Sequence, residues 1–196
     1  MTIFYKLDNS LYINITNSCP CACVFCIRNT TDSVGDAASL WLEKEPTLEE
    51  IFTAFDNIDL DMISEIVFCG YGEPMTRPFD VIEIARYIKA KANLKIRLNT
   101  NGLVYFISPS FDISQLEIID SVSVSLNADD EDEYLRLVCP TFGIFSYDAL
   151  LQFVKDVRKY TSVRLTVMED LGAKRIDNCR KIAQTLDVGF RVREYS

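Results

Sequence analysis

The chain of 196 residues contains no histidine. It therefore cannot supply the imidazole base of a usual catalytic triad or the histidine ligand of a mixed zinc site. It also has no apolar run of the roughly 20 residues that a membrane span needs, so we expect no membrane attachment. Its first 16 residues lack the basic stretch, apolar core and cleavage site of a secretion signal. These absences predict a cytoplasmic protein.

Positive charge is scarce as well. The 20 Lys and Arg residues face 29 Asp and Glu residues, which gives a formal net charge of −9. Nucleic-acid binding depends on clustered cations that contact phosphate groups, so we expect no nucleic-acid partner. Cytoplasmic thiols stay reduced. The seven cysteines are therefore expected to be metal ligands or core residues rather than disulfides.

No repeat, low-complexity tract or Pro/Gly linker divides the chain, so we predict a single domain over residues 1–196. Short apolar runs alternate with helical patterns, and Thr47 and Glu50 form a Thr-x-x-Glu capping box. This alternation predicts parallel strands joined by helical crossovers. The predicted strands are 11–15, 65–70, 94–99, 120–127, 162–168 and 189–195, and the predicted helices are 47–58, 78–91, 112–119, 146–160 and 173–186.

The predicted strands are apolar on one face and polar on the other, as where Val122 and Val124 alternate with serines. Parallel strands covered by helices on both faces would be apolar on both. The pattern favours a curved sheet with helices outside and a polar, ligand-accessible inside; a half-exposed sheet without a ligand is the alternative. Six strands cannot close an eight-stranded barrel. We therefore predict an α/β fold, an open partial (β/α)6 TIM-like barrel of parallel strands.

The segment TNSCPCACVFCIRNT, residues 16–30, follows the first predicted strand and holds four cysteines within eight positions. In (β/α) barrels, active sites lie at the C-terminal ends of strands. A structural zinc site normally draws four ligands from two separated pairs, which this segment does not offer. Three thiolates can hold three irons of a [4Fe–4S] cluster, and soft sulfur ligands favour such clusters.

The spacing Cys19-x3-Cys23-x2-Cys26, with Phe25 before the last cysteine, resembles the signature of radical S-adenosylmethionine (radical SAM) enzymes. The resemblance implies that Cys19, Cys23 and Cys26 hold a [4Fe–4S] cluster with one open iron for SAM, and that Phe25 contacts the cofactor. Cys21 lies outside this register, and we expect it to be a free thiol on the loop.

Further segments extend the resemblance. CGYGEP (69–74) looks like the family's Gly-Gly-Glu-Pro turn, with Tyr71 replacing the first Gly, which implies that Gly72 and Glu73 receive the SAM ammonium group. NTNG (99–102), SLN (125–127) and VRLT (163–166) are similar to later family segments. They imply cofactor contacts at Asn99, Ser125, Asn127 and Arg164. The order of these segments most resembles the TatD-associated radical SAM proteins and implies an association with a TatD-type hydrolase.

The resemblance also implies a reaction. An external one-electron donor of flavodoxin or ferredoxin type reduces the cluster, and SAM is cleaved to a 5′-deoxyadenosyl radical. The radical takes hydrogen from a small-molecule or peptide substrate. Two alternatives stay open: an activating enzyme of the glycyl-radical type that acts on a partner protein, and a non-catalytic iron–sulfur or zinc-binding module.

Other residues are candidates for substrate contact. Cations on the polar strand faces predict an anionic substrate, held by Arg97 or Arg193 in a forked contact. Cys139 follows the fourth predicted strand on the active-site side and is a further candidate for contact with substrate or a radical. The polar segment 28–46 is either a mobile lid or a solvated connection, anchored by Trp41.

Overall fold

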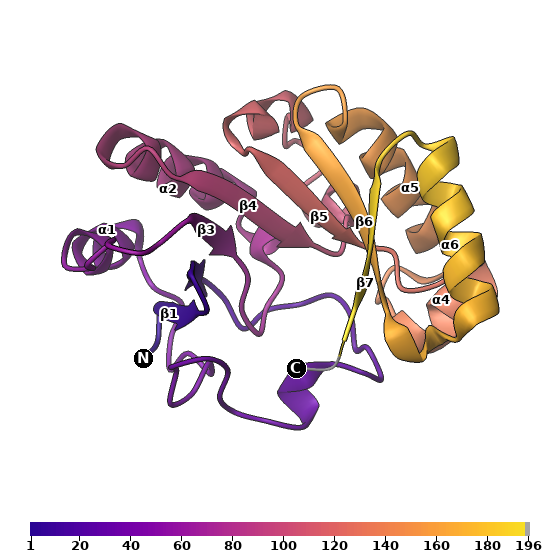
Figure 1. The fold of residues 1–196 in the computed structure, drawn as a ribbon, viewed down its shortest axis with the longest axis horizontal. Coiled ribbons are helices and arrows are strands. Elements are labelled where there is room, and N and C mark those ends of the chain that lie inside the picture. The colour runs from indigo at the N-terminus through magenta and orange to yellow at the C-terminus, as the bar shows by residue number, and fades with distance from the viewer. Residues whose placement is uncertain (195–196) are drawn as a thin grey trace.

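The computed structural model describes residues 1–194, which contain one seven-stranded sheet in the order β1 to β7. β1 pairs antiparallel with β2, and every later neighbouring pair is parallel. The sheet curves from β1 to β7, with helices on its outer side (Figure 1). The strands are β1 (Phe4–Leu7), β2 (Ser10–Ile13), β3 (Glu65–Phe68), β4 (Lys95–Thr100), β5 (Ser121–Ser125), β6 (Ser162–Met168) and β7 (Gly189–Arg193).

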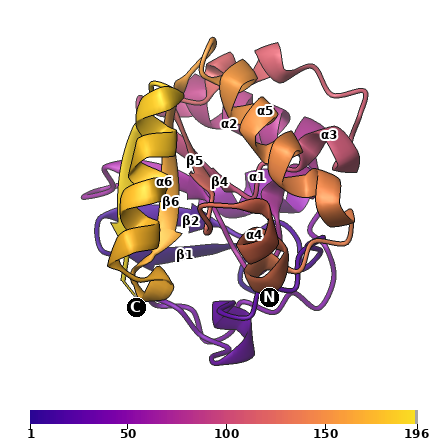
Figure 2. The same ribbon diagram turned by 90° about the vertical axis from the view of Figure 1, so that its right-hand side faces the viewer.

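Six α-helices are described, together with short 3-10 helices. Figure 2 shows how α2, α5 and α6 pack along the outside of the sheet. The predicted capping box is confirmed, because Thr47 and Glu50 each bond the other's backbone N–H. No described helix has the length and apolar character needed to cross a membrane. The helices are α1 (Leu48–Asp56), α2 (Pro78–Lys91), α3 (Val104–Ile107), α4 (Glu131–Val138), α5 (Ser146–Val157) and α6 (Ala173–Thr185).

The two faces of the sheet differ as the alternation predicts. Leu98, Val122 and Leu165 are fully buried in the core between strands and helices. Side chains of the intervening residues, such as Ser123 and Arg164, share the inner face, since paired residues of neighbouring parallel strands point to the same side. The polar face is thus the concave one, and strand ends carry polar groups along one edge of it.

The sequence missed three elements. β1 is a short edge strand, which makes the sheet seven-stranded rather than six-stranded. α3 has only one turn, and α4 buries only Tyr134 and Val138, so neither shows a long apolar periodicity. Residues 113–118 form a 3-10 helix within the predicted helix 112–119. Strand β3 ends at Phe68, earlier than predicted, and the end of the predicted strand 189–195 lies outside the described residues.

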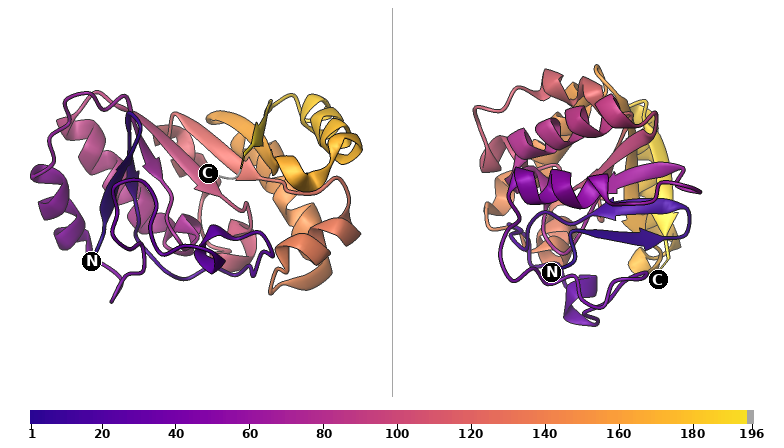
Figure 3. Two further views of the ribbon diagram at one scale, coloured as in Figure 1. Left: turned by 60° about the horizontal axis from the view of Figure 1, so that its bottom comes forward. Right: turned by 90° about the vertical axis from the view of Figure 1, so that its left-hand side faces the viewer.

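The segment 28–46 is fastened to the sheet along its length. Asn17 exchanges two hydrogen bonds with the backbone of Leu42, of 2.7 and 3.0 Å, and Asn14 Nδ2 donates to the Leu40 carbonyl at 2.7 Å. The Trp41 ring lies 5.0 Å from the Tyr71 ring. Figure 3 shows this violet segment beside β1. Backbone contacts, more than Trp41 alone, therefore anchor it.

Replacing Leu98 with Ala tests the assignment of the core face. Leu98 is fully buried on β4, so we expect the free energy of unfolding to fall by about 2–5 kcal/mol in urea titrations of the reduced protein. Ile144→Ala is the control, because its side chain is 58% exposed and its loss should change stability by less than about 0.5 kcal/mol. Equal effects of the two substitutions would contradict the assignment.

Candidate functional site

The cysteine loop follows β2 and is held by the end of α4 and the residues directly after it. Val24 N–H donates to the Leu137 carbonyl at 2.9 Å, and Ala22 N–H donates to the Cys139 carbonyl at 3.3 Å. Cys21 and Pro140 form an isolated antiparallel bridge. Two segments more than 100 residues apart in the sequence are thus joined by their backbones, and α4 fixes where the loop lies.

The four thiols of this loop influence one another. Hydrogen bonding with Cys21 lowers the pKa of Cys19 to about 6 and also lowers the pKa of Cys23. The Cys21 pKa is raised by its hydrogen bonds with these two thiols. Burial raises the pKa of Cys26. Cys21 is only 4% exposed, so it is a buried donor to two neighbouring thiols rather than a solvated thiol on the loop surface.

The donor chemistry of the loop fits an iron–sulfur cluster. Cys19, Cys23 and Cys26 are half-buried and none forms a disulfide. Metal ligation requires thiolates, and two of these thiols have lowered pKa values. Among residues 1–194, no three Cys, Asp or Glu side chains are already arranged as a metal site. The choice of Cys19, Cys23 and Cys26 as ligands stays a prediction.

Glu73 lies in the turn after β3, and its carboxylate is buried. Thr100 Oγ1 donates to it at 2.6 Å, and the backbone N–H groups of Asn101 and Met75 donate at 2.7 and 3.1 Å. Burial nevertheless raises the pKa of Glu73 to about 7. A carboxylate so enclosed can accept a further cationic donor and is stabilised by it.

The glycine before Glu73 is required by close packing. A Cβ atom at Gly72 would lie 2.3 Å from the Thr16 carbonyl oxygen and 2.7 Å from that of Ser18. Glu73 N–H donates to the same Ser18 carbonyl at 2.8 Å. The turn therefore sits directly against the chain that leads into the cysteine loop. The structure thus places Gly72 and Glu73 beside this loop.

The predicted cofactor residues on the later strands lie along the inner face. Asn99 accepts from Arg97 Nη1 at 2.9 Å and hydrogen-bonds the Cys69 thiol. Asn127 follows β5 with φ of +58°, and its side-chain oxygen accepts from Arg193 Nη2 at 3.2 Å. Ser125 and Phe25 are half-buried. The Arg164 charge helps lower the pKa of Glu65.

The three candidates for substrate contact differ in their surroundings. Arg97 forms a two-pronged contact with Glu65, with N–O distances of 2.8 and 3.2 Å. The described contact of Arg193 is instead to a neutral group, the Asn127 side-chain oxygen. Cys139 is exposed with φ of +46°, and its Sγ lies 3.5 Å from the Arg136 carbonyl oxygen. Cys139 contacts the cysteine loop through its backbone carbonyl and not through its thiol.

Sequence reasoning missed three residues that shape the site. Thr100 and Asn101 hold Glu73, and Asn101 Nδ2 also reaches Cys21 Sγ at 3.7 Å. Arg28 donates to the Cys21 carbonyl at 3.2 Å, and its charge helps lower the pKa values of Cys19 and Cys23. The NTNG segment (99–102) contains Thr100 and Asn101 and could have indicated them. For Arg28, two residues after Cys26, the sequence offered no signal beyond its charge.

Sequence comparison finds distant relatives of known name. The chain is 28% identical over 167 residues to a probable dual-specificity RNA methyltransferase RlmN of Clostridium acetobutylicum, covering 83% of this chain and 46% of the relative. It is 27% identical over 179 residues to the RlmN of a Synechococcus species, covering 88% and 48%. The chain spans about half the length of the curated relatives it matches.

Solved structures share the fold. TYW1 with a bound lysine–pyruvate adduct superposes with a TM-score of 0.64 at 16% identity, covering 98% of this chain and 66% of that one. The enzyme anSMEcpe with bound AdoMet superposes with a TM-score of 0.58 at 15% identity, covering 93% and 50%. At these identities the likeness establishes the partial-barrel fold.

The family match covers most of the chain. The Radical SAM superfamily matches residues 13–180, from the end of β2 into α6. This range includes the cysteine loop, the Glu73 turn and the ends of β4 to β6. The family implies a [4Fe–4S] cluster and SAM as cofactors. The chain belongs to the Radical SAM superfamily and is a radical SAM enzyme.

Proposed function

We propose that Cys19, Cys23 and Cys26 hold the [4Fe–4S] cluster of this enzyme and that SAM binds between the cysteine loop and the Glu73 turn. The observation that carries the proposal is their contact: Glu73 N–H donates to the Ser18 carbonyl, one residue before Cys19, at 2.8 Å. When bound, cluster and SAM would supply a 5′-deoxyadenosyl radical that abstracts hydrogen from the substrate. The protein's own groups bind, orient and exclude water.

Each inner-face residue has a role in this proposal. Glu73 accepts hydrogen bonds from the SAM ammonium group, since an ionised carboxylate is an acceptor only. Asn99, Ser125 and Asn127 line the inner-face edge at the ends of β4 and β5 and orient the nucleoside. Arg164 pairs with the carboxylate of the cofactor. An external one-electron donor of flavodoxin or ferredoxin type supplies the electron.

The substrate is proposed to be small and anionic. Inner-face cations favour a negatively charged group, whereas the net charge of −9 disfavours RNA, the substrate class in the names of the RlmN relatives. A partner protein, as for a glycyl-radical-type activating enzyme, is the second candidate substrate. The narrower resemblance to TatD-associated proteins, and a hydrolase partner with it, rests on motif order and stays a prediction.

Substituting single cysteines tests the ligand assignment. Anaerobically reconstituted protein should bind about four irons per chain and absorb broadly at about 400 nm, as a cysteine-held cluster does. Ala at position 19, 23 or 26 removes one thiolate ligand and should abolish both the absorption and SAM cleavage. Iron analysis, absorption spectra and chromatography of 5′-deoxyadenosine measure these outcomes.

Cys21→Ala is the matched control within the same loop. Its thiol lies outside the Cys19-x3-Cys23-x2-Cys26 spacing and the substitution removes no proposed ligand, so its loss should leave iron content and SAM cleavage in place. A Cys21→Ala protein without a cluster, beside a Cys19→Ala protein that keeps one, would show that the ligand register is wrong.

Glu73→Gln tests the ammonium contact. We expect the cluster to remain and SAM to bind about 10- to 150-fold more weakly, because a charge-assisted hydrogen bond contributes roughly 1.5–3 kcal/mol. Calorimetric titration of cluster-loaded protein with SAM measures the affinity. Unchanged affinity would reduce the Glu73 turn to a structural role.

SAM binding should also depend on pH. The Glu73 pKa is about 7, so the carboxyl group is protonated below this pH and ionised above it. Affinity for the SAM ammonium should therefore rise as pH increases through about 7 and level off above it. In Glu73→Gln protein this component of the pH dependence should be absent, and titrations between about pH 6 and 8.5 compare the two proteins.

A further inference from the structure

The guanidinium of Arg193 lies on the inner face of the sheet, and within residues 1–194 its described contact is to a neutral side chain. Its Nη2 donates to the Asn127 side-chain oxygen at 3.2 Å, and its Nε is buried with no hydrogen-bond partner. The carboxylates of Glu65 and Asp129 pair instead with Arg97 and Arg175. Burial lowers its pKa. A cation that is partly buried and has a buried donor without a partner is costly, so this group is suited to a ligand that supplies negative charge.

Two of the other inner-face arginines, those on β4 and β6, are placed differently. Arg97 is neutralised by Glu65 through two contacts of 2.8 and 3.2 Å. Arg164 also acts on Glu65, whose pKa its charge lowers. Both therefore share one carboxylate on β3. Arg193 lies on the edge strand β7, four strands from β3, and does not contact the Glu65 carboxylate.

Arg193 is close to the candidate cofactor site. Cys69, just after β3, and Cys23, in the cysteine loop, lie near enough that their thiolate forms would act electrostatically on its guanidinium. In Figure 1, β7 runs down to the end of the molecule where the violet cysteine-loop segment lies. A negative group at Arg193 would thus lie beside the thiols, on the same side of the sheet, rather than on the outer helical surface.

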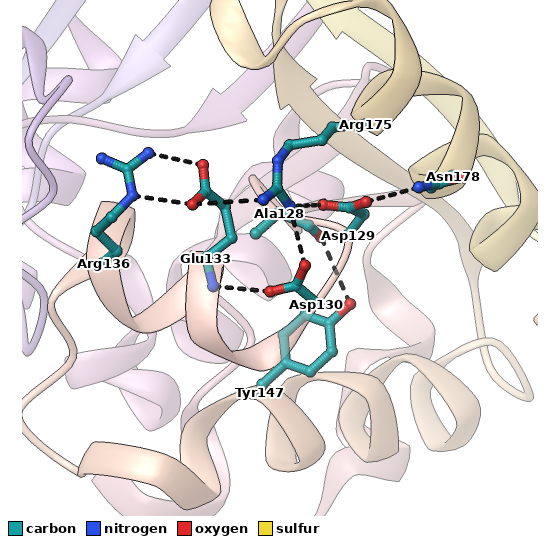
Figure 4. A network of polar contacts seen from close by, with 8 residues as sticks. All are labelled: Ala128, Asp129, Asp130, Glu133, Arg136, Tyr147, Arg175 and Asn178. Carbon is teal, nitrogen blue, oxygen red and sulfur yellow. Dashed lines mark hydrogen bonds and ion pairs between the residues drawn. The ribbon is translucent and has the colours of Figure 1, made fainter.

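A network of ion pairs anchors residues 129 and 130, just after Asn127 in the chain (Figure 4). Arg175 of α6 pairs with both Asp129 and Asp130, the latter at 2.9 Å. Asn178 Nδ2 donates to Asp129 at 2.8 Å. Because Asp129 follows Asn127 by two residues, the network fixes the left-handed turn that presents the Asn127 oxygen. That oxygen binds Nη2 and leaves Nε available.

We propose that Arg193 and Asn127 form a subsite for an oxyanion of the substrate, a carboxylate or a phosphate monoester. The inference rests on the proposed function and names the group through which the substrate is held. The planar guanidinium matches either group through parallel hydrogen bonds, and the free Nε supplies one donor. The subsite positions the rest of the substrate beside the bound cofactor.

The surroundings favour a small anion over a polyanion. The subsite itself offers one guanidinium, which balances about one negative charge. A surface hollow of about 450 Å³ at the start of α4 is lined by Asp130, Glu131, Asp132 and Glu133 together with Arg136 and Arg175. Its four carboxylates outnumber its two guanidinium groups, so this hollow repels a phosphate backbone.

Titration with simple anions tests the subsite directly. Cluster-loaded protein without SAM is titrated by calorimetry with acetate and with inorganic phosphate, as wild type, Arg193→Gln and Arg193→Lys. We expect one probe to bind, at least tenfold more weakly in Arg193→Gln and less weakened in Arg193→Lys. Preference for acetate assigns a carboxylate, and preference for phosphate assigns a phosphate monoester. No binding, or equal binding by Arg193→Gln, would overturn the proposal.

Three controls accompany the anion titrations. Arg86→Gln removes an exposed arginine on α2 paired with Glu83 and should bind the probes as wild type does. Asn127→Gly keeps the left-handed backbone accessible, removes the side-chain oxygen and should weaken probe binding about threefold or more. If the Arg193→Gln protein does not fold, Asn127→Gly serves as the test variant in its place. Unchanged probe binding by Asn127→Gly would then overturn the subsite.

SAM affinity is the third control. Arg193→Gln should bind SAM within about threefold of wild type. A tenfold loss would assign the arginine to the cofactor's own carboxylate and overturn the substrate subsite. Cluster content and SAM cleavage of the wild-type protein are measured first. Their absence would contradict the proposed function, whereas the anion titrations test the subsite alone.

Discussion

The buried carboxylate of Glu73 joins the turn after β3 to the end of β4, and the geometry of the candidate site depends on that link. Thr100 and Asn101 donate to it at 2.6 and 2.7 Å, and the Asn101 amide then reaches Cys21 Sγ at 3.7 Å. Such donors are what make a buried carboxylate tolerable. They do not hold it fully ionised, because burial still raises its pKa to about 7. The Glu73 side chain thus links the turn to β4 and can still bind a cationic ligand.

Charge is sorted between the two sides of the sheet. The chain carries a net charge of −9, yet inner-face positions of β4, β6 and β7 hold Arg97, Arg164 and Arg193. Acidic residues concentrate outside, as at the start of α4, where three of the first residues are carboxylates next to the positive end of the helix. The overall charge therefore predicts poor affinity for polyanions, while the inner face can still bind a single small anion.

Periodicity was sufficient for β2 to β7 and for four long helices, because each depends on neighbours in the sequence, but it missed the short edge strand β1. β6 has the predicted bounds of 162–168, where apolar and polar residues alternate without interruption. α4 was missed because charged residues dominate it, and its role is to hold the cysteine loop. The family motif pointed to Glu73 but not to Thr100. Thr100 is the last residue of β4 and lies on the buried face, where the alternation predicts an apolar side chain, yet its hydroxyl binds Glu73. Contacts between segments distant in sequence depend on the path of the chain in space, which no local pattern contains.

In this chain without histidine, other groups lower the pKa values of two of the loop thiols. Around the thiols, hydrogen bonding by Cys21 and the charge of Arg28 lower the pKa values of Cys19 and Cys23, a role that an imidazolium could otherwise take. Guanidinium groups remain charged across the physiological range, whereas imidazole loses its charge near neutrality. A site whose cations are arginines therefore keeps its positive charge as pH changes. Its pH response is left to the thiols and to Glu73, the groups proposed to contact the cluster and SAM.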